Sequence, residues 1–348
     1  MDQSPSSQAS VAIIAIGRNE GERLIACLKS LLSCGEHVTP SGIFYVDSGS
    51  TDGSAEAAEK LGVNVVRLDM STPFTAARAR NAGVAAVASA ELTPDYIQFL
   101  DGDCRLDAGW LAAAIGFLRA QEAVALVCGR RREIDPGASV YNRLCDIEWD
   151  TPVGAAQASG GDFLIKRVAF EAVGGFREDL IAGEEPEMCF RLRAAGFGIY
   201  RLDHEMTLHD AAMTSIGQWW RRMKRSGYAF ANVSHLHRSS PERMWRRETT
   251  RAFFLGAGLP LGTAIAMSVI HPMAAAILAI YPLQMARIWM ARSDLHKGRT
   301  AYAVSCVMGR FPECVGALNY WADRVQGRRG SLIEYKGAAG ETSGEGLS

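Results

Sequence analysis

Short apolar runs alternate with amphipathic stretches through the first third of the chain. Apolar runs with the length of buried strands occur at residues 11–16, 43–46, 63–68, 96–100 and 123–128. Between them, helical patterns occur at residues 20–34, 51–61, 75–89 and 107–120. Strands that alternate with helices are typical of a parallel sheet covered by helices. The pattern therefore predicts an α/β fold with a Rossmann-like, mostly parallel sheet.

Polar side chains follow three of these predicted strands. Asn19 and Glu20 come after the first, Asp47 after the second, and Asp101 with Asp103 after the fourth. Ligands of open α/β sheets bind at the carboxyl edge of the strands, so we expect a site there. No GxGxxG sequence opens the first helix, which argues against a dinucleotide site.

The Asp101-Gly102-Asp103 turn carries two carboxylates two residues apart after a buried strand. Such a pair suits Mg²⁺ or Mn²⁺, because these hard cations prefer carboxylate oxygen. A metal there would neutralise charge on a departing diphosphate. An ordinary Asp-Gly turn has the same sequence, and both interpretations stay open on this motif alone.

A second acidic loop lies between the second strand and the next helix. Asp47 is placed to accept a hydrogen bond from a base N–H, and Asp52 to face the base or the ribose. Asp52 is equally suited to capping the following helix, and the two roles are compatible.

The rear of the chain contains a long uncharged stretch. Residues 252–286 include no charged side chain apart from the titratable His271. One helix of this length would measure about 52 Å, which exceeds the roughly 30 Å core of a bilayer. We therefore expect a spanning hairpin at 252–291 that turns at His271-Pro272, with re-entrant or interfacial helices and an oligomer core as the alternatives. The amphipathic tail that follows is expected at the membrane interface.

Charge divides the chain in the same place. Residues 1–220 carry 19 basic and 30 acidic side chains, whereas residues 221–348 carry 18 and 8. The acidic front argues against nucleic-acid binding, and the basic rear favours an anionic membrane surface. Basic residues on both sides of the hairpin predict that both of its ends face the cytoplasm.

The cysteines and the first apolar run bear on whether the front domain is exported. The eight cysteines lack metal-finger spacing, and the first apolar run is too short to span a membrane. Both features favour a front domain that is not exported.

These patterns predict four regions and one location. The regions are a disordered tail at 1–10, a catalytic domain at 11–235, a membrane-associated helical region at 236–336 and a disordered tail at 337–348. We expect the inner cell membrane, with the catalytic domain facing the cytoplasm.

Four motifs occur in a defined order along the front domain. They are Arg18-Asn19-Glu20-Gly21, Val46-Asp47-Ser48-Gly49-Ser50-Thr51-Asp52-Gly53-Ser54, Ala79-Arg80-Asn81-Ala82-Gly83 and Leu100-Asp101-Gly102-Asp103. In order and spacing, residues 10–225 resemble the bacterial family 2 inverting glycosyltransferases of GT-A fold. The resemblance implies a nucleotide-sugar donor, a divalent metal and inversion at the anomeric carbon. Gly17-Arg18 departs from the family, in which a proline often precedes the Asn-Glu pair.

The resemblance also implies roles for single residues. Donor contacts are expected from Asn19, Glu20, Asp47, Asp52, Arg80, Asn81, Asp101, Gly161 and Asp162, and metal ligation from Asp103 and His209. Asp103 is expected to bind the metal directly, while Asp101 meets the donor ribose or a metal-bound water. Gly161 and Asp162 belong to a glycine-bearing segment expected beneath the donor sugar, although a plain turn has the same composition.

Glu185 is the expected catalytic base. Pro186 suits the first turn of a helix, which would place Glu185 at the N-cap. The helix dipole favours a charged carboxylate there, so we expect Glu185 to be ionised near neutral pH and to accept a proton. The resembling family has a Glu-Asp pair here, and its second member is the base. Simple capping of the helix is the alternative.

Two further cationic segments have two interpretations each. Arg130-Arg131-Arg132 is suited to contacting phosphates or to lying in a solvated loop. Trp219-Trp220-Arg221-Arg222 is suited to contacting the acceptor or the diphosphate, or to anchoring the chain at a membrane interface.

These expectations combine into one predicted activity. It is a Mg²⁺- or Mn²⁺-dependent hexosyltransferase that moves a sugar from a nucleotide-sugar to a hydroxyl of a saccharide. The membrane region favours a lipid-linked acceptor in cell-envelope or exopolysaccharide synthesis, and no nucleic-acid partner. A nucleotidyltransferase is one alternative, but the chain lacks its usual Gly-rich basic loop. A catalytically silent, nucleotide-sugar-binding membrane scaffold is another.

Overall fold

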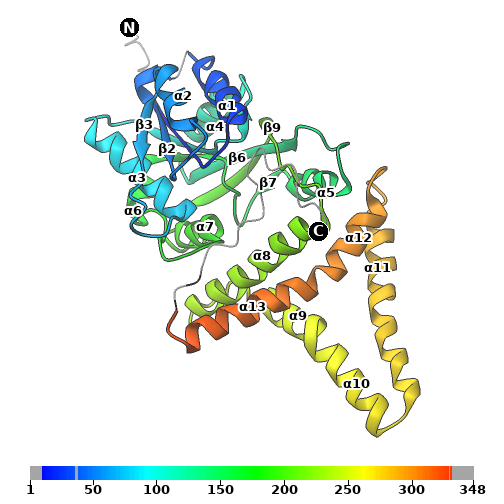
Figure 1. Cartoon of the computed structure of the whole chain (residues 1–348). Coiled ribbons are helices and arrows are strands. Elements are labelled where there is room, and N and C mark those ends of the chain that lie inside the picture. The colour runs from blue at the N-terminus through cyan, green and yellow to red at the C-terminus, as the bar shows by residue number, and fades with distance from the viewer. Residues whose placement is uncertain (1–9, 36–37, 329, 331–348) are drawn as a thin grey trace, which may run out of the picture.

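The computed structural model describes residues 10–35, 38–328 and 330. Its sheet has the strand order β3-β2-β1-β4-β8-β6-β9-β5, with β7 paired to β9 (Figure 1). The strands are β1 Val11–Gly17, β2 Ile43–Asp47, β3 Asn64–Arg67, β4 Tyr96–Asp101, β5 Cys104–Leu106, β6 Val124–Glu133, β7 Gly154–Ala155, β8 Phe163–Lys166 and β9 Gly198–His209. The predicted tails at 1–10 and 337–348 lie outside the described residues, apart from Ser10.

Helices lie on both sides of this sheet and continue beyond it (Figure 1). They are α1 Glu22–Leu32, α2 Ser54–Lys60, α3 Ala76–Ser89, α4 Trp110–Ala120, α5 Val140–Trp149, α6 Arg167–Ala172, α7 Glu184–Ala194, α8 Ile216–Leu236, α9 Arg246–Phe253, α10 Leu259–Val269, α11 Ile280–Ala291, α12 Arg299–Met308 and α13 Arg310–Val325. Three shorter helical segments are η1 Pro40–Gly42, η2 Phe254–Gly258 and η3 Pro272–Ala279.

The predicted α/β fold is confirmed, but the sheet is mixed rather than mostly parallel. Strands β3, β2, β1 and β4 run parallel, as expected. Strand β8 then enters antiparallel between β4 and β6, and β5 and β7 pair antiparallel with β9. The antiparallel strands are only two to four residues long, too short to show a strand pattern in the sequence. Strand β6, which was also predicted, pairs parallel with β9, so the prediction misses only the three short antiparallel strands.

Close packing of α3 on the central strands positions part of the site. A Cβ atom at Gly83 would lie 2.4 Å from Cγ2 of Ile14 in β1, so only glycine allows this approach. The contact places Arg80, one turn earlier on α3, against the carboxyl edge of the sheet. The glycine that ends the Ala79–Gly83 motif thus serves the site through packing.

Helices α8 and α13 pack against each other below the sheet, with their backbones in close contact (Figure 1). A Cβ atom at Gly227 of α8 would lie 1.9 Å from the Glu313 carbonyl oxygen, and one at Gly316 of α13 equally close to the Lys224 carbonyl oxygen. The expected amphipathic tail is therefore packed against α8 along α13. Since α8 runs to Leu236, the predicted domain boundary falls at its last turn.

Two apolar helical segments project away from this body in a V (Figure 1). Arg246–Val269 has 24 residues and Pro272–Ala291 has 20, and both are long and apolar enough to cross a membrane. No residue of α11 is buried, and Thr263 alone is buried in α10. The two segments meet at His271, as predicted, and suggest membrane association. Whether they span the membrane remains a prediction.

Candidate active site

The Asp101-Gly102-Asp103 turn links β4 to β5 at the carboxyl edge of the sheet. The Gly102 amide donates to the Ile16 carbonyl at 2.7 Å, which holds the turn against the end of β1. Cys104 then pairs with His209 across the β5–β9 ladder. This pairing brings His209, 106 residues later in the chain, to Asp103, with 3.2 Å between its Nε2 atom and Asp103 Oδ2. The structure therefore brings together the two predicted metal ligands.

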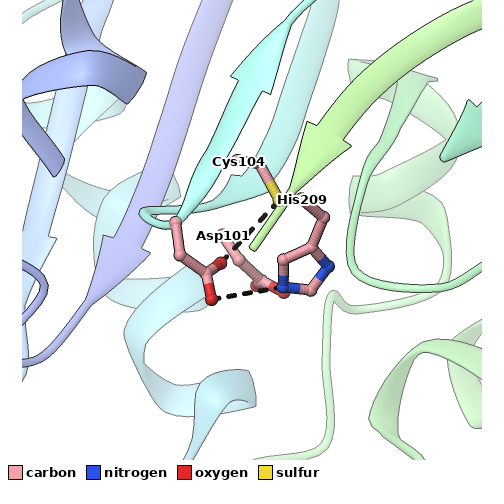
Figure 2. Close-up of side chains that lie close together, drawn as sticks. Asp101, Cys104 and His209 are labelled. Atoms are coloured by element: carbon pink, nitrogen blue, oxygen red, sulfur yellow. Dashed lines mark hydrogen bonds and ion pairs between the residues drawn. The ribbon is translucent and has the colours of Figure 1, made fainter. Parts of the chain in front are cut away.

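A possible cation site is centred on these side chains. Single ligand atoms of Asp101, Asp103, Cys104 and His209 all lie within 4.8 Å of one another (Figure 2). Burial raises the pKa of the Cys104 thiol well above its usual value, and Asp162 and Asp103 raise it further. Sulfur is a soft ligand, whereas the carboxylates and the imidazole fit Mg²⁺ or Mn²⁺.

The imidazole of His209 is fixed by two neighbours. It stacks on the Trp149 indole at 4.6 Å with an interplanar angle of 9°. The Arg131 guanidinium lies 3.4 Å from its Nδ1 atom. Trp149 was not singled out from the sequence, because it lies 60 residues from His209 and no motif marks it.

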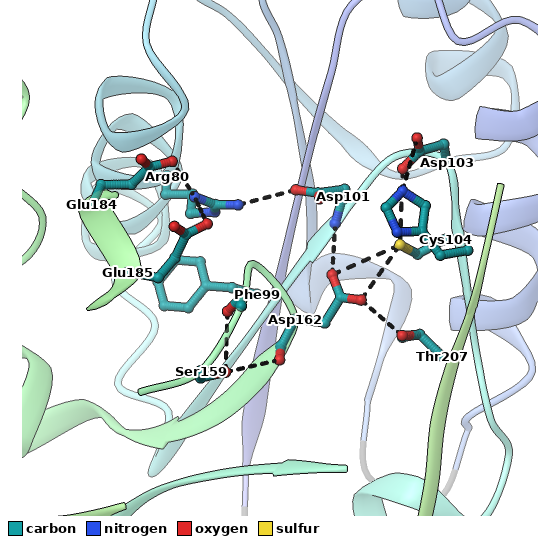
Figure 3. Close-up of polar contacts among 12 residues, drawn as sticks. Arg80, Phe99, Asp101, Asp103, Cys104, Ser159, Asp162, Glu184, Glu185 and Thr207 are labelled. Carbon is teal, nitrogen blue, oxygen red and sulfur yellow. Dashed lines mark hydrogen bonds and ion pairs between the residues drawn. The ribbon is translucent and has the colours of Figure 1, made fainter. Parts of the chain in front are cut away.

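Arg80 connects the turn to helix α7. Its buried guanidinium pairs with Asp101 at 3.0 Å, with Glu184 at 3.2 Å and with Glu185 at 2.9 Å (Figure 3). Burial alone would raise the pKa of Asp101, but Arg80 and Arg131 outweigh it and lower that pKa. Arg80 thus lines the cavity, as expected near a donor, and also holds the expected base close to the Asp101 carboxylate.

Glu185 lies two residues further into helix α7 than predicted. Gly183 is the N-cap residue, with a φ of 82°, and Glu184 begins the helix. Burial, followed by the neighbouring Glu184, raises the pKa of Glu185 to about 7, although Arg80 opposes the shift. Desolvation therefore opposes the helix dipole, and the expected ionisation of Glu185 near neutral pH stays a prediction.

The two acidic loops near the expected nucleoside site are tied together. The Asn19 side-chain oxygen accepts from the Thr51 amide at 2.7 Å, and Asp52 accepts from the Gly21 and Ser54 amides at 3.0 Å each. Asp47 accepts from the Gly49 and Ser50 amides. Asn19 and Glu20 line the cavity, whereas Asp47 and Asp52 are not among its lining residues. Both aspartates thus shape the loops.

The glycine-bearing segment lies beside Arg80. A Cβ atom at Gly161 would be 2.6 Å from the Arg80 guanidinium and 3.2 Å from the Asp101 carboxylate, so this cavity wall requires glycine. Asp162 is buried behind the wall, where it pairs with Arg131 at 2.9 Å and accepts from the Thr207 hydroxyl at 2.7 Å (Figure 3). It is engaged within the protein and does not line the cavity.

Asn81 also points away from the cavity. Its side-chain amide donates to the Phe176 carbonyl at 2.9 Å and to Glu178, and its oxygen accepts from the Phe176 amide. These bonds fix the loop between α6 and α7. The expected donor contact of Asn81 is therefore not seen in this geometry.

One cavity of about 600 Å³ lies beside these groups, and the predicted residues that line it are Asn19, Glu20, Arg80, Asp101, Asp103, Gly161 and Glu185. His209 is not among its lining residues. The wall opposite the sheet comes from α8 and the segment before α9: Arg222, Arg225, Ser226, Ala229, Phe230 and Trp245. Arg222 also pairs with Glu148 at 2.6 Å. The Trp219–Arg222 segment signalled part of this wall, but Arg225 and Trp245 had no signal in the sequence. The cavity thus has one acidic, metal-compatible wall and one basic, aromatic wall.

Comparison with known proteins shows what the front of the chain resembles. Residues 10–174, just under half of the chain, match the family model described as Glycosyl transferase family 2. The front of the chain is therefore similar to the domains of this family. The match includes the Asp101-Gly102-Asp103 turn and ends before Glu185 and His209.

Two curated relatives that resemble the chain are named as glycosyltransferases. Pre-mycofactocin glycosyltransferase of Mycobacterium tuberculosis is 27% identical over 172 residues, which are 46% of this chain and 35% of the relative. The chain therefore matches only about a third of that protein. Glycosyltransferase AglE of Haloferax volcanii is 24% identical over 243 residues, 68% of this chain and 77% of the relative.

A solved structure shares the fold of the front of the chain and of the region behind it. Mannosyltransferase PcManGT from Pyrobaculum calidifontis, in complex with GDP-Man and Mn²⁺, matches with a TM-score of 0.62. The match covers 92% of this chain and 89% of that chain, at 17% sequence identity. At this identity the likeness establishes a GT-A-like fold.

Proposed function

We propose that the chain is a metal-dependent, inverting glycosyltransferase that moves a hexose from a nucleotide-sugar to an acceptor hydroxyl. The observation that carries the proposal is the position of Glu185. It lies in the cavity, joined through Arg80 to Asp101 of the metal-compatible turn. A base and a leaving-group site on either side of one cavity suit a single displacement.

In the proposed reaction, Asp103 and His209 hold Mg²⁺ or Mn²⁺, and Asn19 and Glu20 contact the nucleoside. When bound, the metal neutralises charge on the leaving diphosphate. Glu185 takes the proton of the acceptor hydroxyl while its oxygen attacks the anomeric carbon. The bond from that carbon to the diphosphate breaks, the nucleoside diphosphate leaves with both electrons, and the configuration inverts.

The basic wall and the apolar hairpin support a membrane-borne acceptor. The guanidinium groups of Arg222 and Arg225 are suited to binding a phosphate. Trp245 lines the same cavity and directly precedes the first apolar segment, so the cavity lies next to the expected membrane region. We infer a lipid-linked saccharide acceptor in cell-envelope or exopolysaccharide synthesis, at the inner membrane with the domain facing the cytoplasm.

Exchanging Glu185 for Gln tests the role of the base. The proposal expects Glu185→Gln to lower transfer by at least about 100-fold, because general-base catalysis contributes about that much. Donor affinity in Mn²⁺ should stay within about threefold of wild type. Release of nucleoside diphosphate from a panel of UDP- and GDP-sugars in detergent measures transfer, and calorimetry measures donor binding.

Glu178→Gln is the matched control, since Glu178 lies outside the cavity lining. It should transfer at the wild-type rate. Full transfer by Glu185→Gln would exclude Glu185 as the base. Release of pyrophosphate by the wild type would favour the nucleotidyltransferase alternative, and donor binding without any release would favour the silent scaffold.

A further inference from the structure

Four arginines lie within nine residues at the root of the apolar hairpin. Arg243, Arg246, Arg247 and Arg251, here called the arginine cluster, are all exposed. They line a second, open cavity of about 620 Å³ together with Glu242 and Thr250. Arg247 and Arg251 are four residues apart on α9 and therefore share one helix face. The cluster is separate from the candidate active site.

The four arginines outnumber the two acidic residues of the same stretch, Glu242 and Glu248. Among the ion pairs formed between described residues, none includes an arginine of the cluster, while Glu242 in the same cavity pairs with Arg193. Four cations at this spacing repel one another. An anion from outside the chain would relieve this repulsion, and guanidinium groups bind phosphate oxygens in pairs.

The position of the cluster indicates where that anion comes from. Arg246 is the first residue of the apolar segment Arg246–Val269, and no charged side chain follows Arg251 within it. If this segment enters a bilayer, the cluster lies at the level of the head groups. We propose that the arginine cluster binds the phosphates of anionic phospholipids. This rests on the membrane attachment inferred under the proposed function, but not on the transfer reaction.

The cluster is linked to the active site through Trp245. The Trp245 indole lines the active-site cavity and packs edge-to-face on Phe230, with 5.0 Å between the ring centroids. It also lies against Gly183, where an added Cβ atom would be 2.8 Å from the indole. Arg243 and Trp245 have φ angles of 47° and 56°, a conformation that side-chain-bearing residues rarely adopt. Such backbone persists where its surroundings hold it. Lipid phosphates bound on both sides of Trp245 supply such a hold.

Lipid titration of the full chain tests the proposal without donor or acceptor. The melting temperature of the purified protein in zwitterionic detergent is followed while phosphatidylglycerol, phosphatidylcholine or inorganic phosphate is added. Phosphatidylglycerol should raise it well above the phosphatidylcholine level, and 0.5 M NaCl should remove that difference. Arg243→Gln/Arg247→Gln/Arg251→Gln should weaken the apparent phosphatidylglycerol affinity roughly 100-fold, at about fivefold for each cation.

The matched control removes three exposed cations far from the hairpin. Lys29→Gln/Lys60→Gln/Arg105→Gln should keep the full response to phosphatidylglycerol. A retained response in the cluster variant would overturn the proposal, as would an equal effect of inorganic phosphate, which would indicate a general anion site. If the cluster variant does not fold, a salt-insensitive lipid response of the wild type overturns it instead. Loss of transfer with an intact lipid response would count against the proposed function alone.

Discussion

At the scale of single residues, the raised pKa of Glu185 predicts how transfer depends on pH. Only the ionised carboxylate accepts a proton, and burial places the pKa of Glu185 at about 7. The transfer rate should therefore rise about tenfold per pH unit below 7 and level off above it. Rates at saturating donor between pH 5.5 and 8.5 measure this. Donor affinity in Mn²⁺, measured at each pH, distinguishes protonation of Glu185 from protonation of the metal site. A transfer rate that does not change with pH would contradict the assignment of Glu185 as the base.

The metal site gives a second prediction at this scale. Asp103→Asn and His209→Ala should each weaken Mn²⁺ binding by at least about 100-fold, because even the loss of an outer-shell partner costs 10- to 100-fold. Cys104→Ser should leave Mn²⁺ affinity nearly unchanged, since Mn²⁺ prefers carboxylate oxygen to sulfur. Calorimetric titration of the donor-free protein with Mn²⁺ compares the three variants. A large effect of Cys104→Ser would instead make the sulfur a ligand.

Single site residues were predictable where a local motif marked them. The Asp101-Gly102-Asp103 turn can be recognised from three consecutive residues. The contact between Arg80 and Glu184 joins positions 104 residues apart, so no local motif indicates it. The raised pKa of Glu185 could not be predicted for the same reason. The helix dipole is visible in the sequence, but burial by distant segments is not.

At the scale of elements, the crossing of α8 and α13 depends on two glycines. A Cβ at Gly227 would lie 1.9 Å from the Glu313 carbonyl oxygen, so Gly227→Ala must push the helices apart. We expect a loss of about 2 kcal/mol or more in stability and a melting temperature several degrees lower. Because α8 also carries Arg222 and Arg225, transfer should fall as well.

Gly116 provides the matched control for this substitution. It lies within helix α4, and a Cβ there would meet no atom within 4 Å. Gly116→Ala should therefore stabilise the protein by about 0.5–1 kcal/mol through helix propensity. Thermal unfolding of both variants gives the comparison, and an unchanged melting temperature for Gly227→Ala would mean that the helices do not pack this closely.

The elements themselves were predictable in proportion to their length. Strands β1, β2 and β4 are apolar runs of five to seven residues and were found from the sequence. Strands β5 and β7 have three and two residues, and their direction depends on partners far along the chain. Since the three antiparallel strands are too short to show a pattern, the mixed character of the sheet was missed.

At the scale of the whole molecule, the open point is the side of the membrane on which the hairpin tip lies. If both segments span, Met273 at the exposed tip faces away from the catalytic domain, whereas Lys60 stays on the catalytic side. If the segments lie flat on the surface, both positions share one side. The division of charge favours spanning, because basic residues flank both ends of the hairpin on the side of the domain.

Single cysteines at these two positions distinguish the arrangements. We expect Met273→Cys to resist a membrane-impermeant maleimide in sealed inverted vesicles and to react after detergent is added, while Lys60→Cys reacts in both. Seven of the eight native cysteines are buried, so the unsubstituted protein defines a low background. Equal labelling of both positions in sealed vesicles would place the hairpin on the membrane surface. In that case the arginine cluster and the apolar segments would meet the same leaflet, and the acceptor would reach Trp245 along that surface rather than past a spanning helix.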